Sequence, residues 1–253
     1  MRKKTARLEM AILGNVFLKP KRYIGRRIGC YTITGFAGEG RYGSCFRAVS
    51  DTGNNVIIKR FKPGIFEKNG RIKECEAVIL SQLNDDRFPE FLGVINHDGF
   101  YAFVMEEKPG CTFEQLLFRE KKRLSGTEFF SFGMQLIQII RHLHEQGIVH
   151  RDIRIPNIIV DSSGRLSLVD FGLARFADNV NCRYCQDYSY LGDVLLYLLY
   201  SSFQKKEGER GGPWYSELPL SERQMVLLKR LMGIERIYGS IDEIENDFKA
   251  AFG

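Results

Sequence analysis

The chain has 253 residues, enough for one large domain or for two lobes. Its hydrophobic fraction of 44% and charged fraction of 27% are ordinary for a soluble globular protein, and the composition indicates no disordered segment. The net charge is +6, and it is unevenly distributed. An apolar run at residues 191–200 contains Asp193 and is too short to span a bilayer, so we expect a cytoplasmic protein.

A basic N-terminal arm, residues 1–27, holds a single acidic residue, Glu9. Its basic side chains are Arg2, Lys3, Lys4, Arg7, Lys19, Lys21, Arg22, Arg26 and Arg27. Such a charge run is typical of a solvated leader. The mostly apolar stretch 10–18 leaves open a weak contact with an anionic membrane or a partner. Aromatic residues do not alternate with the charges, so nucleic acid is not expected. The arm also lacks the cleavage site of a signal peptide.

The first half of the chain after the arm has the alternating pattern of β-strands. Strands are predicted at residues 31–36, 44–49, 56–61, 93–96 and 100–106. Asp51-Thr52-Gly53-Asn54 predicts a hairpin between the second and third of them. One helix is predicted in this half, at residues 71–83.

The second half has the pattern of helices. Residues 127–146 are apolar on nearly every face, which predicts a buried central helix that ends at Gly147. Further helix starts are indicated by the pairs Thr112 and Gln115, Ser221 and Gln224, and Ser240 and Glu243. Strands followed by helices predict an α+β fold with two lobes, at residues 28–106 and 107–253. Pro109-Gly110 breaks regular structure near the join.

Glycines and a lysine in the first lobe suggest phosphate binding. Residues 38–43 read G-E-G-R-Y-G between the first two strands. The simplest interpretation is a flexible turn. However, a strand follows the glycines rather than a helix. This order favours a glycine hairpin that covers phosphates with its backbone N–H groups, and it disfavours a dinucleotide-binding fold. Lys59 lies in an apolar strand, where a lysine is costly unless it is paired. Glu76 is its predicted partner, Glu74 is the alternative partner, and an edge lysine reaching solvent is the alternative structure.

The second lobe carries two motifs of oxygen-bearing side chains. H-R-D-I-R-I-P-N occupies residues 150–157, and D-F-G follows at residues 170–172. Asp152 is the candidate base that accepts or orients a hydroxyl proton, and Arg154 is placed to contact a transferring phosphate. Asn157 and Asp170 offer the hard oxygen ligands that magnesium prefers. The alternative is that these polar residues only connect loops.

Taken in order, these motifs resemble those of eukaryotic-type (Hanks-type) protein kinases over roughly residues 30–250, and most of all short bacterial serine/threonine kinases. The resemblance implies a bilobal fold, with a small antiparallel β lobe carrying one helix and a larger, mainly helical lobe. It implies ATP and Mg²⁺, with Mn²⁺ as an alternative ion, and protein substrates that present Ser or Thr. It implies that Met105 is the gatekeeper residue and that Leu80, His150 and Phe171 stack as the internal hydrophobic spine of the family. The nucleotide contacts that it implies are Ala37, Gly38, Gly40, Gly43, Cys45, Ile57, Lys59, Glu76, Glu106, Lys108 and Ile159, and Lys59 is also expected to act in catalysis.

The chain departs from the family pattern in three places. Ile57 replaces a small residue and Cys45 a valine, which changes the shape of the expected adenine site. Arg154 replaces a lysine, which keeps the charge and favours Ser or Thr acceptors. Residues 173–186, which follow D-F-G, are short, contain no A-P-E and have Tyr184 as their only hydroxyl. We therefore expect a site that is assembled constitutively or by a partner, without a Ser/Thr phosphorylation switch in this segment.

Three functions stay open. The first is a serine/threonine protein kinase, because every phosphate, magnesium and base position is filled. The second is a kinase-fold phosphotransferase for a small molecule, which the short segment favours. The third is an ATP-binding scaffold without turnover. The six scattered cysteines predict free thiols, with a redox pair at Cys182 and Cys185 as the alternative.

Overall fold

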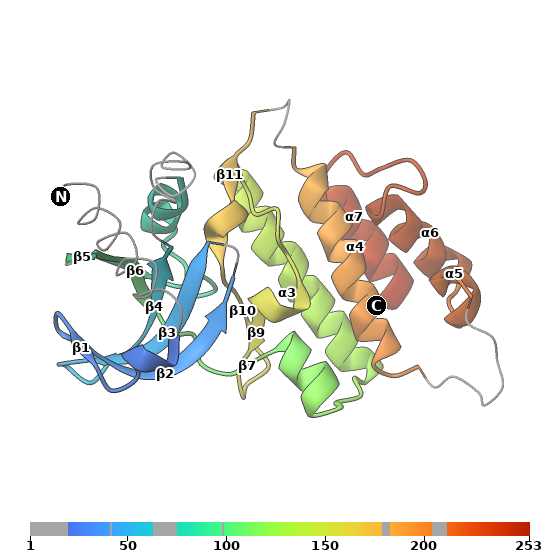
Figure 1. Ribbon diagram of the computed structural model, residues 1–253. Coiled ribbons are helices and arrows are strands. Elements are labelled where there is room, and N and C mark those ends of the chain that lie inside the picture. The colour runs from blue at the N-terminus through green and yellow to red at the C-terminus, as the bar shows by residue number, and fades with distance from the viewer. Residues whose placement is uncertain (1–19, 41, 63–74, 98, 179–182, 204–211) are drawn as a thin grey trace, which may run out of the picture. The chain divides into compact units, whose positions relative to one another are not determined.

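The computed structural model describes residues 20–40, 42–62, 75–97, 99–178, 183–203 and 212–253 (Figure 1). The chain divides into a strand-rich unit, Met1–Ala77 with Pro89–Glu107, and a helical unit, Val78–Phe88 with Lys108–Gly253. The predicted α+β class, with a small antiparallel part and a larger helical part, is confirmed. The predicted lobe boundaries place residues 78–88 in the first lobe, whereas their contacts group them with the helical unit. Residues 1–19 of the basic arm, residues 71–74 of the first predicted helix and Cys182 lie outside the described residues.

The strand-rich unit is built on one antiparallel sheet in the order β1-β2-β3-β4-β6-β5. Its strands are β1 (Arg27–Ile28), β2 (Tyr31–Glu39), β3 (Gly43–Ser50), β4 (Asn55–Phe61), β5 (Phe91–His97) and β6 (Phe100–Glu106). The predicted hairpin between β3 and β4 is confirmed, because Ser50 N donates to the Asn54 carbonyl at 2.9 Å and Gly53 has a φ of +85°. Residues 75–82 form a helix, the described part of the helix predicted at 71–83.

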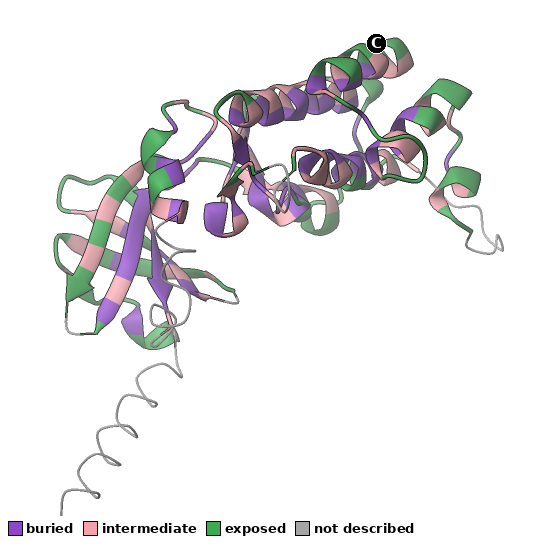
Figure 2. Cartoon of the chain, turned by 90° about the horizontal axis from the view of Figure 1, so that it is seen from above, coloured by how far each residue is buried: buried purple, intermediate pink, exposed green. Residues whose placement is uncertain are grey.

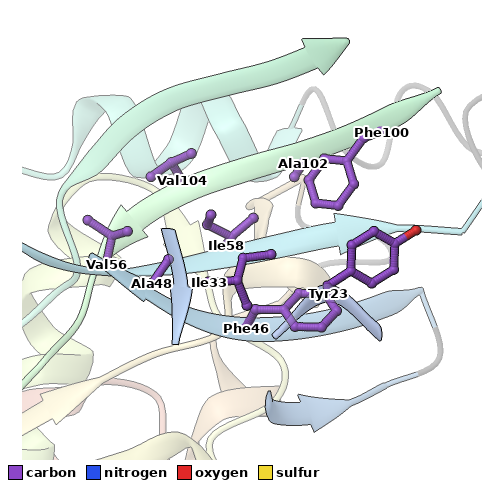
Figure 3. Packing of buried hydrophobic residues seen from close by; sticks show 9 residues of the cluster. All are labelled: Tyr23, Ile33, Phe46, Ala48, Val56, Ile58, Phe100, Ala102 and Val104. Atoms are coloured by element: carbon purple, nitrogen blue, oxygen red, sulfur yellow. The ribbon is translucent and has the colours of Figure 1, made fainter. Parts of the chain in front are cut away.

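One face of this sheet carries an apolar core (Figure 3). Burial varies from residue to residue along β2, whereas β4 and β6 are buried at most positions (Figure 2). Successive side chains of a strand point to opposite faces of the sheet. The core consists of Tyr23, Ile33, Phe46, Ala48, Val56, Ile58, Phe100, Ala102 and Val104. Residues of β4 that alternate with this set, Ile57 and Lys59, therefore belong to the other face of the sheet.

The end of the basic arm belongs to this core. Tyr23, in the 3₁₀ turn η1 (Pro20–Tyr23), is 8% exposed, and its ring lies 5.6 Å from that of Phe46 and 5.5 Å from that of Phe100. The buried Arg60 guanidinium lies 4.7 Å from the Tyr23 ring and 5.0 Å from the Phe100 ring, within the range of cation–π attraction. The leader at residues 1–27, expected to be solvated and partly ordered, is ordered at this turn, because the Tyr23 ring fills a position in the core.

The helical unit includes residues 78–82 of the helix at residues 75–82. Its further α-helices among the described residues are α3 (Gly126–Glu145), α4 (Cys185–Tyr200), α6 (Glu222–Leu231) and α7 (Ile241–Phe252), and α5 (Trp214–Glu217) is a single turn. The predicted central helix at 127–146 is confirmed as α3. Its N-terminal cap is Ser125. The Ser125 hydroxyl accepts a hydrogen bond from Glu128 N, and Ser125 N donates one to the Glu128 carboxylate. Gly147, with a φ of +70°, follows its end as predicted.

The predicted caps at Thr112, Ser221 and Ser240 are confirmed by their hydrogen bonds. Thr112 precedes a π-helical turn, η2 (Gln115–Arg119), rather than a long helix. The short elements are β7 (Cys111–Thr112), β8 (Ile148–Val149), η3 (Ile155–Asn157), β9 (Ile158–Val160), β10 (Leu166–Leu168), η4 (Phe171–Leu173) and β11 (Arg175–Phe176). The short strands form two sheets, one in the order β10-β9-β7 and one of β11 and β8. Within the described ranges, no helix combines the length and apolarity needed to cross a bilayer.

Candidate active site

The loop between β8 and β9 draws three predicted site residues together in the helical unit. The Arg154 guanidinium holds the Asp152 carboxylate at two points, Nε to Oδ1 at 2.6 Å and Nη2 to Oδ2 at 2.9 Å. This bond raises the pKa of Arg154 above its usual value. Asn157 Nδ2 donates to the Asp152 carbonyl at 2.9 Å and to its carboxylate at 2.8 Å. The Asp152 side chain is therefore fixed by two neighbours and only 12% exposed.

The same bonds set the direction of the Asn157 side-chain oxygen. Both of its amide hydrogens point to Asp152, so the side-chain oxygen is turned the other way. The Asn157 carbonyl accepts from Val169 N at 2.9 Å, which brings Asp170 alongside. Asp170 has a φ of +65°, unusual for a residue with a side chain, and its carboxylate accepts from Gly172 N at 3.3 Å. An amide and a carboxylate oxygen are hard donors of the kind that Mg²⁺ takes.

The rings of His150 and Phe171, residues of the two motifs, pack against each other. The predicted contact of His150 with Phe171 is present, with ring centroids 4.7 Å apart and planes at 75°. His150 is completely buried, and this burial lowers its pKa, against the opposing effect of the Asp187, Asp170 and Asp152 carboxylates. The ring is therefore neutral at neutral pH, and its Nδ1 accepts from Asp152 N at 3.3 Å. Leu80, the third residue of the predicted stack, is also buried.

A buried carboxylate that the sequence analysis left without a role anchors this loop. Asp187, in the first turn of α4, has no exposed surface. Its carboxylate accepts from His150 N at 2.9 Å and from Arg151 N at 2.8 Å. It also pairs with His144 Nε2 at 3.0 Å. Because Arg151 has a strained φ of +65°, the loop requires such external bonds to keep its shape. The sequence signal is the resemblance of residues 187–192 to the D-x-W-x-x-G start of the family's long buried helix, which predicts the helix but gives Asp187 no role.

The strand-rich unit holds the predicted pair of Lys59 and Glu76. Lys59 Nζ lies 2.6 Å from Glu76 Oε1, and the two side chains are 10% and 3% exposed. The pairing predicted from sequence is confirmed, and Glu74, the alternative partner, lies outside the described residues. A buried lysine ammonium fixed in this way is a stationary positive charge on the sheet.

The remaining predicted nucleotide contacts are divided between the two units. Cys45 lies opposite Lys59 in the β3–β4 ladder and opposite Gly38 in the β2–β3 ladder, and Ile57 is two residues before Lys59. These side chains therefore share the face of Lys59. Three other predicted residues fall elsewhere, with Ala37 exposed on β2 and the buried Lys108 and half-buried Ile159 in the helical unit. Glu106 N donates to the Glu90 carbonyl at 2.9 Å, so a contact from the Glu106 backbone would use its carbonyl.

The glycines of residues 38–43 are not equivalent. A Cβ on Gly43 would lie 1.9 Å from the Arg60 carbonyl oxygen, because β3 and β4 approach closely there. A Cβ on Gly38 or Gly40 would meet nothing within 4 Å. Gly43 is therefore required by strand packing, and the space over Gly38 and Gly40 suits the approach of a ligand to the backbone.

Gly43→Ala is expected to lower the free energy of unfolding by about 1–3 kcal/mol, the usual cost of overpacking, because the β3–β4 pairing must shift. Gly40→Ala is the matched control and should leave the thermal midpoint unchanged while weakening ATP binding. Thermal unfolding and an ATP titration of both variants test this. A Gly43→Ala protein as stable as the parent would mean that the strands adapt without cost.

The family match and the similar known proteins agree with one another. Residues 31–205 match the family model described as the protein kinase domain. The chain is 33% identical over 229 residues to the probable serine/threonine-protein kinase YbdM of Bacillus subtilis (strain 168), covering 87% of this chain and 89% of that protein. It is 31% identical over 157 residues to the hormonally up-regulated neu tumor-associated kinase of Homo sapiens, covering 60% of this chain and 22% of that protein. It is also 31% identical over 156 residues to mitogen-activated protein kinase kinase kinase 3 of Arabidopsis thaliana, covering 58% and 27%.

Proposed function

The chain belongs to the protein kinase family, and we propose that it transfers the γ-phosphate of ATP, with Mg²⁺, to Ser or Thr hydroxyls of other proteins. The observation that carries this proposal is the arrangement around Asp152. A carboxylate fixed by Arg154 and Asn157 is what an in-line phosphate transfer needs.

Asp152 is the group that orients the acceptor hydroxyl and takes its proton. Its carboxylate is neutralised by Arg154, which is 55% exposed and can turn from Asp152 toward a phosphate. Asn157 stays bonded to both the backbone and the side chain of Asp152, so the carboxylate keeps its place when the arginine leaves. The base thus stays positioned while the positive charge moves to where negative charge accumulates.

Lys59 and the oxygen ligands have different roles in phosphate binding. Lys59, held by Glu76, supplies a fixed ammonium for the α- and β-phosphates. Asn157 and Asp170 would hold Mg²⁺, which when bound neutralises charge on the phosphate oxygens. The open surface over Gly38 and Gly40 supports a backbone approach to the phosphates on the strand-rich unit.

Two observations favour Ser or Thr as the acceptor. Arg154 supplies a cation two residues after Asp152, and a relative that matches over 87% of this chain is named a probable serine/threonine-protein kinase. The short segment after D-F-G favours the alternative, a small-molecule acceptor, because the A-P-E motif expected beside a bound peptide is missing from the sequence.

Radiolabelled ATP with Mg²⁺ and a generic basic protein acceptor tests the proposal. We expect acid-stable label on Ser or Thr of the acceptor, and none when Asp152→Asn replaces the parent protein. A parallel panel of sugar, aminoglycoside and nucleoside acceptors covers the alternative. Label on a small molecule alone would replace the protein acceptor, and tight ATP binding without any transfer would make the chain a scaffold.

A further inference from the structure

An aromatic side chain from the segment after D-F-G packs on the anchor of the catalytic loop. Tyr184 caps the N-terminus of α4, and its carbonyl accepts from Asp187 N at 3.0 Å. Its ring centroid lies 4.4 Å from that of His144, in the last turn of α3, with the planes at 34°. Tyr188, one turn further along α4, lies 5.5 Å from the same His144 ring. The imidazole is therefore in contact with two phenol rings.

Packing must set the orientation of this imidazole. The His144 side chain is 7% exposed, and its Nε2 lies 3.0 Å from Asp187 Oδ2. Because a carboxylate only accepts, Nε2 carries the proton. The other nitrogen, Nδ1, is buried and has no hydrogen-bond partner among the described residues. One polar tether leaves the ring able to swing about that bond, so the neighbouring rings of Tyr184 and Tyr188 must restrain it.

The direction of the imidazole matters because Asp187 is shared. Its two oxygens accept from His150 N and Arg151 N as well as from His144. A fully buried carboxylate is costly unless each lone pair is used, so losing the His144 donor weakens the whole anchor. The two backbone N–H groups that it holds directly precede Asp152. A looser anchor therefore lets the base drift from its position.

We propose that Tyr184 is a positioning residue whose ring, packed on His144, keeps the Asp187 anchor and hence Asp152 in place. It would do so without phosphorylation of a Ser or Thr in this segment, since residues 173–186 contain neither. The segment after D-F-G is thus tied to the catalytic loop by ring packing. The effect on rate rests on the proposed kinase function, whereas the effect on the loop does not.

Three variants of Tyr184 separate the ring from the hydroxyl and from bulk. Tyr184→Ala removes the ring, Tyr184→Leu keeps apolar volume without a flat ring, and Tyr184→Phe removes only the hydroxyl. Tyr197→Ala, a tyrosine on the same helix that is 48% exposed, is the matched control. The first readout is amide hydrogen exchange at His150 and Arg151, whose N–H groups the anchor holds. The second is kcat and KM for ATP.

We expect Tyr184→Ala and Tyr184→Leu to speed exchange at both amides and to lower kcat by about tenfold, the effect of roughly 1.4 kcal/mol. KM for ATP should stay within about twofold, because Lys59 is untouched. Tyr184→Phe and Tyr197→Ala should behave as the parent protein. Should Tyr184→Ala fail to fold, Tyr184→Leu makes the same comparison with the volume retained.

Parent-like exchange in Tyr184→Ala or Tyr184→Leu would overturn the proposal. Equal defects in Tyr184→Phe and Tyr184→Ala would also overturn it, because the hydroxyl and not the ring would then be responsible. If exchange quickens as expected but the parent protein transfers no phosphate to any acceptor, the positioning role stands and the proposed function fails.

Discussion

Asp152→Asn is expected to remove most phosphate transfer while leaving the fold and ATP binding intact. Asparagine keeps the shape of the side chain but cannot take a proton, and it loses the charge that pairs with Arg154 at 2.6 Å. General-base catalysis contributes about 10²- to 10⁴-fold, so we expect a fall in rate of that order. Single-turnover transfer to a protein acceptor measures it, because a single turnover reports the chemical step without product release.

The control for this variant is Asp193→Asn, an exposed aspartate on α4 that the proposed chemistry does not use. It should transfer phosphate like the parent protein. ATP titration and thermal unfolding of Asp152→Asn exclude a trivial loss of structure. Unchanged transfer in Asp152→Asn would refute the base assignment, and a loss of ATP binding would place Asp152 in nucleotide binding instead.

Lys59→Ala is expected to act on both stability and transfer. Removing one partner of a buried ion pair costs about 3–5 kcal/mol, because the other charge stays in a low-dielectric site. Here that charge is the Glu76 carboxylate, which is 3% exposed. Transfer should fall as well, since the α- and β-phosphates lose their ammonium. Denaturant unfolding and a steady-state ATP titration measure the two effects.

The double variant Lys59→Met/Glu76→Leu separates these effects. Replacing both charges of a buried pair with apolar side chains of similar size is often neutral for stability. We therefore expect the double variant to regain most of the stability lost in Lys59→Ala but none of the transfer. If transfer returned together with stability, Lys59 would have only a structural role, and the assignment of the strand-rich unit to phosphate binding would be wrong.

Local patterns in the sequence predicted the elements well. The central helix at residues 127–146 is observed as α3 (Gly126–Glu145), and the caps at Ser221 and Ser240 are present. The true cap of α3, Ser125 with Glu128, was missed because Thr127 was taken as the start. Resemblance to short bacterial serine/threonine kinases, which rested on motif order, is confirmed by a relative that matches across 87% of the chain.

What the sequence did not reveal depends on contacts between distant residues. The Lys59–Glu76 pair was predicted because a lysine in an apolar strand calls for an acid on the next helix. Nothing local marks Tyr23 as a core residue inside a basic arm, since its neighbours in space are Phe46 and Phe100. The role of Asp187 likewise depends on backbone groups 36 and 37 residues earlier in the chain. The chemical roles of the site residues stay predictions until the variants are measured.

The packing of Tyr23 in the core of the sheet limits where truncated variants of this protein can begin. The span that matches the family, residues 31–205, excludes Tyr23 at one end and Phe248 at the other. Both are buried, and Phe248 packs so closely on Gly133 of α3 that a Cβ there would lie 2.1 Å from its ring. A chain truncated to residues 31–205 would lose both rings, and the apolar side chains that they cover would be exposed to water. Truncations intended to remove the charged leader should therefore begin no later than residue 20.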